Sequence, residues 1–572
     1  MLSVLLIWLY MLFTCYVTGF ACIRGILGKK NFRCKREISY LFAGIGAVTV
    51  YAQFFSIFGK VGLAANLLLL LICGACTALF GKEMAEGLGA LLRTITPLKA
   101  AAVVALLLLF AYGTSTGILH YDTALYHAQS IRWIEEYGVV PGLGNLHSRL
   151  AYNSAAFCLS ALYSMAFLGG QSYHCCAGFL AFLLSLVCTE AFAEARKKPR
   201  LSDFARVIAV YYLLILYDEM ISPASDYFMV LLALYLIIRW LDLLERKEDS
   251  YLPYAMLCVL GVVVVTVKLS GALILLLTLK PAVMMIRKKA GKDIAVFLGT
   301  GIFAAAPFLI RNVILSGWLV YPFTFLDLFS FDFKIPKGMA DYDAHEIQVW
   351  GRGYSDVSRY GEPVTRWLPD WIRNLDGTDK VFLALALSGL LALLLLAVYA
   401  LVRKKRDMAD FLHIAGTLAA CFLFWLLSAP LIRYGCVFLW MFPTLVWGWS
   451  YLRVSPHLDR FKIYYIAIIL LGTYKLWAFG LETGKTLTAE YLVNQKDYEN
   501  FETIPYELHG YTFYYPASGD RTGYRDFPSS PIKAASADGN TSAKEAGDIF
   551  RGETIKEGFK DAKQPESIPD QG

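Results

Sequence analysis

Residues 100–119, AAAVVALLLLFAYGTSTGIL, form the stretch that decides the fold. The run carries no charged side chain, and about 20 apolar residues are what a helix needs to cross a bilayer core of about 30 Å. Similar runs recur along the chain, in which 57% of the residues are hydrophobic and 17% are charged. The composition therefore predicts an all-α polytopic membrane protein.

The apolar runs predict about 14 transmembrane helices. They are expected at 1–23, 39–58, 62–81, 98–118, 171–193, 204–220, 225–244, 251–267, 270–286, 293–313, 380–402, 410–429, 434–452 and 462–480. Two further segments, about 123–137 and 152–169, are expected to be in-plane juxtamembrane helices after the fourth span. Residues 152–169 are apolar enough to span, but a span there would put the basic cluster at 196–200 on the opposite side from the others.

Basic loops give the orientation. Lys and Arg cluster at 24–36, 196–200, 287–292 and 403–406, all on one side in this arrangement, which the positive-inside rule makes the cytoplasm. The expected organisation is a transmembrane domain over 1–480, with outer loops at about 119–170 and 314–379, and an extracytoplasmic C-terminal tail over 481–572. In this small tail, 533–547 is too polar to bury and is expected to be disordered, Tyr511–Tyr515 to form a short strand, and 519–524 to turn.

Charge and cysteine usage exclude two other classes. The net charge of +7 does not indicate nucleic acid, because the basic residues sit in short clusters between spans. Most of the 12 cysteines lie in apolar runs, and none occurs in 314–378 or 481–572, which argues against a disulfide framework.

The apolar run at 100–119 leads directly into HYDTALYHAQSIRW, residues 120–133. On a helix that starts near Asp122, positions 122, 126, 129 and 133 share one face, which presents a carboxylate, a phenol, an amide and an indole. Such groups can hold a sugar, so Asp122, Tyr126, His127 and Trp133 are candidate site residues. The simpler alternative is that Asp122 only caps the helix, and the two roles are compatible.

A glycine-rich turn follows at 141–149, PGLGNLHSR. Gly142 and Gly144 permit close backbone approach, and Arg149, with His147 nearby, could bind a phosphate. The Lys-Ser/Thr signature of a P-loop is missing. An ordinary connecting turn is the alternative.

A second acidic segment, Asp218 to Asp226, joins two predicted spans at the outer side. Carboxylates are costly within the bilayer, so these should lie at its boundary or face a wet cavity. The segment could hold a divalent cation through oxygen ligands, or be a solvated turn.

Three basic residues, Lys268, Arg311 and Arg433, stand at outer span ends, against the positive-inside bias. A phosphate or pyrophosphate group at that depth would explain them, and snorkelling to lipid headgroups is the alternative. The 314–379 loop adds tryptophans and acids, a combination that suits carbohydrate or a lid near the membrane, although aromatic residues are common at membrane interfaces.

This pattern resembles the GT-C superfamily of membrane glycosyltransferases, in which an acid stands in the first large outer loop and in-plane helices follow it. More closely, residues 140–154, Arg311-Asn312, 316–322, Ala429-Pro430 to Arg433, and the 519–528 segment resemble an uncharacterised family of bacterial membrane proteins. This resemblance spans roughly 98–530. It implies a multi-pass protein of the bacterial cytoplasmic (inner) membrane.

The GT-C resemblance implies a transferase that moves a sugar from a polyprenyl-phosphate carrier to a glycan or other acceptor on the outer face. Asp122 would be the general base, and Arg149, Arg311 or Arg433 would neutralise the departing phosphate. Membrane lipids are expected partners and nucleic acid is not; a divalent cation is left open. The alternatives are a polysaccharide polymerase or ligase, which would rely on Arg352 and His345, and a lipid-linked oligosaccharide flippase, which should show a repeat and mid-membrane charges.

Overall fold

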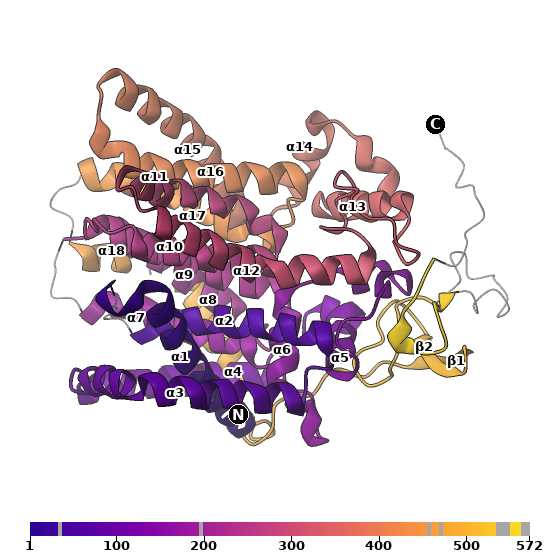
Figure 1. The fold of residues 1–572 in the computed structure, drawn as a ribbon. Helices are drawn as coiled ribbons and strands as arrows, with labels where there is room; N and C mark the ends of the chain where they lie inside the picture. Colours follow the sequence, from indigo (N-terminus) through magenta and orange to yellow (C-terminus); the bar gives the residue numbers. More distant parts are fainter. Residues whose placement is uncertain (32–36, 194–197, 455–458, 468–472, 534–548, 562–572) are drawn as a thin grey trace.

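The computed structural model describes the chain except for residues 32–36, 194–197, 455–458, 468–472, 534–548 and 562–572. Most of the described chain is helical, and the long helices run side by side in Figure 1. These are α1 (Leu2–Asn31), α2 (Glu37–Phe58), α3 (Leu63–Leu92), α4 (Pro97–Thr116), α9 (Ser225–Glu245), α12 (Gly291–Ser316), α15 (Gly377–Val402), α16 (Ala409–Ser428) and α17 (Ile432–Val454). The shorter helices are α5 (Ala128–Glu136), α6 (Ala155–Tyr163), α7 (Cys176–Ala193), α8 (Leu201–Leu216), α10 (Leu252–Val267), α11 (Leu279–Arg287), α13 (Lys337–Gly351), α14 (Val364–Asn374), α18 (Arg460–Ala467) and α19 (Thr473–Thr486).

Within the described residues, 10 helices are long and apolar enough to cross a membrane. They comprise the nine long helices and the segment Leu269–Arg287, in which a 3₁₀ stretch continues into α11. A multi-pass helical protein is therefore confirmed, but a count of 14 spans is not. The other four predicted spans fall on α7, α8 and α10, which are not among these ten, and on α18 and α19, which flank residues outside the described chain. Helices also occupy both segments expected to lie in plane, and that orientation stays a prediction.

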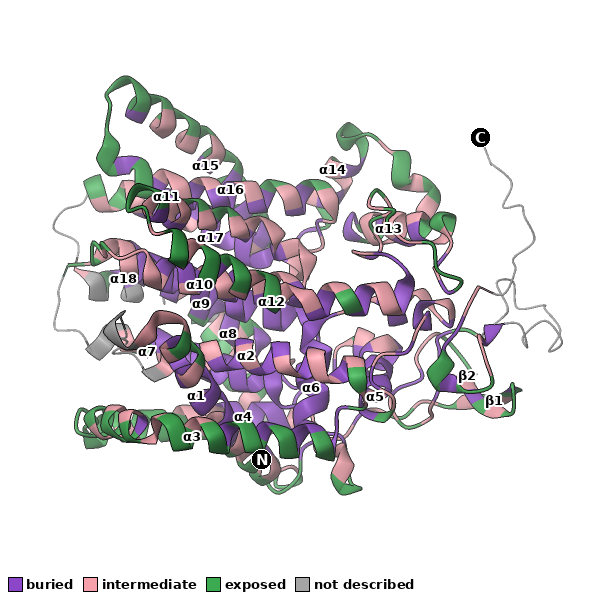
Figure 2. Cartoon of the chain, in the orientation of Figure 1, coloured by how far each residue is buried: buried purple, intermediate pink, exposed green. Residues whose placement is uncertain are grey.

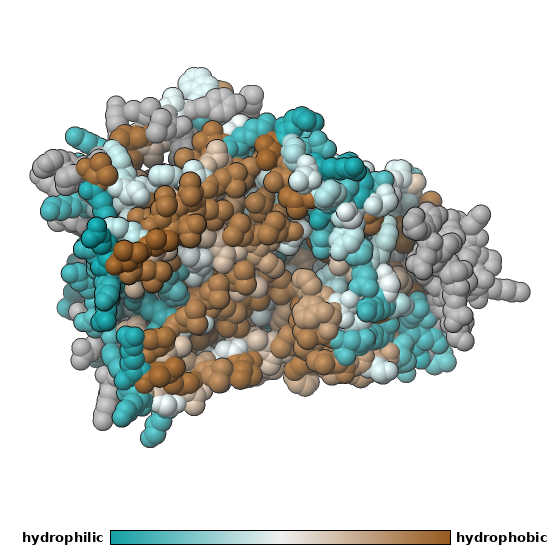
Figure 3. Space-filling view, turned by 90° about the horizontal axis from the view of Figure 1, so that it is seen from above, coloured by the Kyte–Doolittle hydropathy of each residue, from teal (hydrophilic) through white to brown (hydrophobic). Residues whose placement is uncertain are grey.

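The surface has the distribution that a bilayer requires. Figure 3 shows a broad hydrophobic band between two hydrophilic margins. Figure 2 shows exposed residues along α3 and α15, where leucines such as Leu71 and Leu394 are exposed. An apolar surface of this extent belongs against lipid or protein rather than water.

Close helix packing builds the interior. Between α1 and α2, a Cβ on Gly19 would collide with the carbonyl oxygen of Tyr40, and one on Gly44 with that of Cys15. Small residues at such crossings let two membrane helices approach closely. Helix α9 is buried along most of its length and packs against α7, α8, α10 and α17. The interior therefore fixes where the ends of these helices lie.

The C-terminal segment packs on the helical part. Strands β1 (Thr503–Leu508) and β2 (Tyr511–Pro516) pair antiparallel, which confirms the strand expected at Tyr511–Tyr515. His509 and Gly510 both have positive φ, as a two-residue hairpin turn requires. Phe513 and Phe559 pack with Trp133 of α5 in one apolar cluster. The expected disordered stretch, 533–547, lies outside the described residues apart from Lys533.

Candidate functional site

Four charged side chains from four distant segments meet at one end of the helices. Asp122 follows α4, Asp226 stands in the first turn of α9, Lys268 follows α10 directly, and Arg433 stands in the first turn of α17. An acid at the start of a helix is favoured by the helix dipole, which suits Asp226. The cation at the start of α17 has no such support and depends on acidic partners.

Arg433 joins the two acids. Its Nη2 donates to Oδ2 of Asp122 at 2.5 Å, and its Nε lies 3.7 Å from Oδ2 of Asp226. The ammonium of Lys268 donates to Oδ1 of Asp226. The formal charges of these four side chains, which we call the charged cluster, therefore cancel.

The charged cluster stays within reach of a ligand. Side chains of Asp122 and Arg433 are 17% and 25% exposed, whereas Asp226 is 5% exposed. Burial alone would raise the pKa of the Asp122 carboxyl, but the charge of Arg433 and its hydrogen bond outweigh burial and hold that pKa below its usual value. Asp122 is thus an ionised carboxylate at neutral pH.

His120 and Tyr434 complete the surroundings of Arg433. The imidazole of His120 lies against the guanidinium, with 2.5 Å between Nε2 and Nη1. Burial, followed by the charge of Arg433, lowers the pKa of His120, so this side chain is neutral. The ring of Tyr434 lies 3.7 Å from Nζ of Lys268 and 5.2 Å from Cζ of Arg433, within range of a cation–π interaction with both.

The acidic segment 218–226 supports the cluster as well as contributing to it. Ser222 Oγ accepts the backbone N–H of His120 at 2.6 Å. Glu219 accepts the hydroxyl of Tyr227, whose ring lies edge-on to His120. Among the described residues, no group of three or more His, Cys, Asp or Glu side chains is placed to hold a metal ion. The divalent cation left open at this segment gains no set of ligands from the geometry.

The face expected at positions 122, 126, 129 and 133 is divided in the structure. Thr123–His127 form one turn of π-helix before α5, and this wider turn breaks the 3.6-residue periodicity on which the expectation rested. Tyr126 is enclosed by the rings of His127, Tyr152 and Phe157 on the side of the charged cluster. Gln129 instead donates to the backbone of Gly523 and Asp526 in the C-terminal segment.

Two candidates of the segment 120–133 are fully enclosed. Trp133 is 1% exposed and packs against Phe527 and Phe559, so it holds the C-terminal segment rather than a ligand at the cluster. His127 is 2% exposed, and burial lowers its pKa to about 3. It is a neutral packing partner of Tyr126.

The glycine-rich turn at 141–149 also serves the fold. A Cβ on Gly142 would collide with the carbonyl oxygen of Phe559, so the expected close approach is made by the protein's own chain. His147 caps a short helical turn by accepting the N–H of Arg149, and burial lowers its pKa to about 3. The guanidinium of Arg149 lies over the ring of Trp350, 4.6 Å from its centroid.

Arg311 does not join the charged cluster. Its Nη1 donates to Ser56 at 2.5 Å and its Nε to Asn153 at 3.1 Å, and the side chain is buried between helices. Of the three basic residues expected at outer span ends, only Lys268 and Arg433 therefore meet in the structure.

The loop at 314–379 contributes a buried acid that reaches Tyr126 through Tyr152. Asp343 of α13 accepts the hydroxyl of Tyr152 at 2.7 Å, and the ring of Tyr152 lies edge-on to Tyr126. Burial raises the pKa of Asp343, against the hydrogen bond from Tyr152. In the same loop, Arg352 donates to the carbonyl of Tyr360, whose ring stacks on His345.

Sequence reasoning did not select His120, Ser222 or Tyr434 as site residues. His120 and Tyr434 stand within two positions of Asp122 and Arg433, and this adjacency is the signal that could have found them. Ser222 gives no such signal, because its contact is to a backbone group 102 positions away.

The fold and the charged cluster define a multi-pass helical membrane protein with a polar site at one end of its helices. The chain belongs to a family described as a domain of unknown function (DUF8201), whose model matches residues 1–440. That range contains all four residues of the charged cluster. No curated protein and no solved structure matches the chain.

Proposed function

We propose that this protein is a membrane glycosyltransferase that takes a sugar from a polyprenyl-phosphate carrier at the outer face of the membrane. The observation that carries the proposal is the charged cluster, in which a partly exposed carboxylate, Asp122, is paired with a cation, Arg433, that suits phosphate. Both groups stand at helix ends, where a lipid-borne phosphate would lie.

In this proposal the ligand-free cluster holds its charges in balance until a phosphate arrives. The phosphate oxygens compete with Asp122 and Asp226 for Arg433 and Lys268. Asp122 then loses its closest positive partner, which raises its pKa and makes it a better proton acceptor. Binding of the carrier thereby prepares the base.

The transfer itself is a single displacement. The acceptor hydroxyl oxygen forms a bond to the anomeric carbon, the bond from that carbon to the phosphate oxygen breaks, and the hydroxyl proton passes to Asp122. The negative charge that develops on the departing lipid phosphate is stabilised by Arg433 and Lys268. Neutral His120 fixes the orientation of the Arg433 guanidinium.

Binding of the carrier is the first test. The protein in detergent is titrated with polyprenyl phosphate and with the same polyprenol lacking phosphate. Arg433→Gln should weaken binding of the phosphate lipid about 10- to 100-fold, because it removes charge-assisted hydrogen bonds. Arg373→Gln, a change at an exposed arginine of α14, is the matched control and should bind as wild type does. Equal binding of both lipids, or undiminished binding by Arg433→Gln, would sink the proposal.

Asp122→Asn separates the base from a merely structural ion pair. It should bind polyprenyl phosphate at least as tightly as wild type, because Arg433 is released. It should also lose release of polyprenyl phosphate from a polyprenyl-phosphate hexose by about 10²- to 10⁴-fold in the presence of acceptor. Retained release would refute the base role, and a preference for polyprenyl pyrophosphate would favour a polymerase or ligase.

A further inference from the structure

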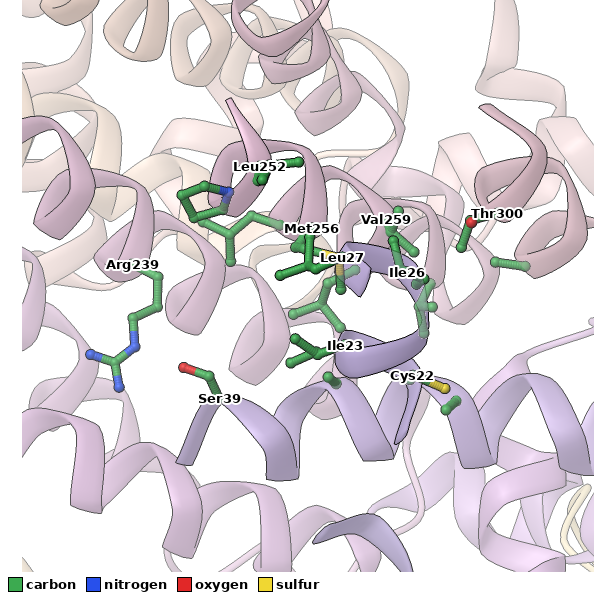
Figure 4. A pocket seen from close by; sticks show the side chains of 18 of the residues that line it. Cys22, Ile23, Ile26, Leu27, Ser39, Arg239, Leu252, Met256, Val259 and Thr300 are labelled. Atoms are coloured by element: carbon green, nitrogen blue, oxygen red, sulfur yellow. The ribbon is translucent and has the colours of Figure 1, made fainter. Parts of the chain in front are cut away.

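A second site lies at the other end of the helices. A cavity of about 1050 Å³ opens between the last turns of α1, most of the length of α2 and α10, the C-terminal half of α9, and the middle of α12. Figure 4 shows Ile23 and Leu27 of α1 opposite Leu252 and Met256 of α10. Asp242 of this cavity and Asp226 of the charged cluster stand 16 positions apart on α9, roughly 24 Å along the helix axis. The two sites are separate.

The cavity exists because α2 presents small residues to it. Ala43, Gly46 and Ala47 lie on one face of α2 and line the cavity. A Cβ on Gly46 would make only ordinary contacts, 3.5 Å from Leu260 and Val263. The remaining wall is mainly Ile, Leu, Met, Val and Phe side chains, which is a lining for an apolar chain and not for a sugar or a nucleotide.

One end of the cavity is polar. Arg239 is 5% exposed there and pairs with Glu190 at 2.6 Å and Asp242 at 3.1 Å. Its Nε has no hydrogen-bond partner among the described residues. Arg246 lines the same end, with Glu248 as the neighbouring acid.

A basic rim adjoins this end. Met285 and Ile294, on either side of the loop between α11 and α12, pack with Ile26 and Leu27 of the cavity wall. This loop and the helix ends on either side of it carry four exposed cations, which are Arg287, Lys288, Lys289 and Lys292. A cavity with an apolar interior and a cationic mouth has the charge and shape of an amphiphile with an anionic head.

We propose that this cavity binds one acyl chain of an anionic phospholipid, whose phosphate lies at the basic rim. The proposal does not depend on the glycosyltransferase activity proposed above, since it uses neither the charged cluster nor any substrate of that reaction. Such a lipid would brace α1, α2, α9, α10 and α12 against one another at this end.

Native mass spectrometry of the whole protein in neutral detergent tests the proposal. Phosphatidylglycerol and phosphatidylcholine with identical acyl chains are titrated separately. One phosphatidylglycerol should bind at least 10-fold more tightly than phosphatidylcholine, and soluble glycerol phosphate should not displace it. Equal binding of the two lipids would refute recognition of an anionic head group at the basic rim. Displacement by glycerol phosphate would refute binding of the acyl chain in the cavity.

Cavity filling locates the bound lipid. Gly46→Phe should weaken phosphatidylglycerol binding at least 10-fold, while Gly299→Phe, at an exposed position of α12 with open space around it, should leave binding unchanged. Gly46→Leu fills less space and replaces Gly46→Phe if the latter does not give a monodisperse protein. Undiminished binding in the folded Gly46 variant would overturn this location.

Discussion

The guanidinium of Arg433 and the carboxylate of Asp122 form a 2.5 Å hydrogen-bonded ion pair across 311 positions of sequence. The pair ties the start of α17 to the segment that follows α4. Trp425 holds the backbone that precedes Arg433, because its indole N–H donates to the carbonyl of Leu431 at 2.9 Å. The same ring packs against the backbone of Gly435, where α17 departs from helical geometry.

Breaking this ion pair should destabilise the protein in a coupled manner. Arg433→Gln and Asp122→Asn should each lower the free energy of unfolding by roughly 1–3 kcal/mol, because the first leaves Asp122 without its cation and the second removes the closer of the two acids of Arg433. The double variant should lose less than the sum, with a coupling of roughly 0.5–3 kcal/mol. Unfolding in mixed micelles at increasing SDS concentration measures the free energy of unfolding of wild type, the two single variants and the double variant. Strict additivity would show that the pair does not act as a unit.

Replacing Gly435 should disturb the site without touching a charge. A Cβ there would overlap the Trp425 indole, so Gly435→Ala must move either the ring or the start of α17. We expect binding of polyprenyl phosphate to weaken about 10-fold, since one misplaced charge-assisted hydrogen bond has this magnitude. Gly416→Ala in α16, where a Cβ meets nothing within 4 Å, is the control and should bind normally. Wild-type binding by Gly435→Ala would remove the positioning role of Trp425.

Stability should fall as the pH drops from about 6.5 towards 4. The folded-state pKa values of His127 and His147 lie at about 3 and that of His174 at about 4, all because of burial. The unfolded chain takes up these protons near pH 6.5, so stability is fully present above that value and is lost as the pH falls. The lowered pKa of Asp122 adds a further loss only below its ordinary value of 3.8.

Thermal unfolding at pH 7.5, 6 and 5 checks this dependence. His127→Phe keeps an aromatic ring beside Tyr126 and Phe157 but removes one titrating group. The variant should therefore show a shallower loss of unfolding temperature between pH 7.5 and 5 than wild type. An identical pH dependence in both proteins would mean that His127 is already protonated or accessible in the fold.

Helix positions could be predicted from the sequence because about 20 apolar residues admit few arrangements in a membrane protein. Asp122, Asp226, Lys268 and Arg433 could be selected for a related reason, since ionisable residues at span ends need an explanation. Their pairing could not be predicted, because it depends on which helix ends are neighbours. Arg311, like Arg433, stands at a predicted outer span end, yet its guanidinium donates to Ser56 and Asn153 between helices.

Local backbone geometry accounts for the failed prediction of a shared face. A regular helix from Asp122 would align Trp133 with the acid, but the π turn at 123–127 displaces α5, and Trp133 faces the C-terminal segment instead. Apolar periodicity does not reveal a π turn. The contribution of the C-terminal segment was equally hidden, because its contacts to Gln129 and Glu135 cross almost 400 positions.

Tyr434 provides the final test of how the cluster holds its cations. Its ring lies 3.7 Å from Nζ of Lys268, and a cation–π interaction that is partly shielded from water contributes roughly 0.5–2 kcal/mol. Tyr434→Phe should therefore bind polyprenyl phosphate as wild type does, while Tyr434→Leu should bind it about 3- to 30-fold less tightly, because a flexible Lys268 must be ordered by the ligand. Isothermal titration in detergent distinguishes these outcomes. Equal losses in both variants would assign the effect to the hydroxyl, and no loss in either would show that Lys268 needs no ring to hold it in place.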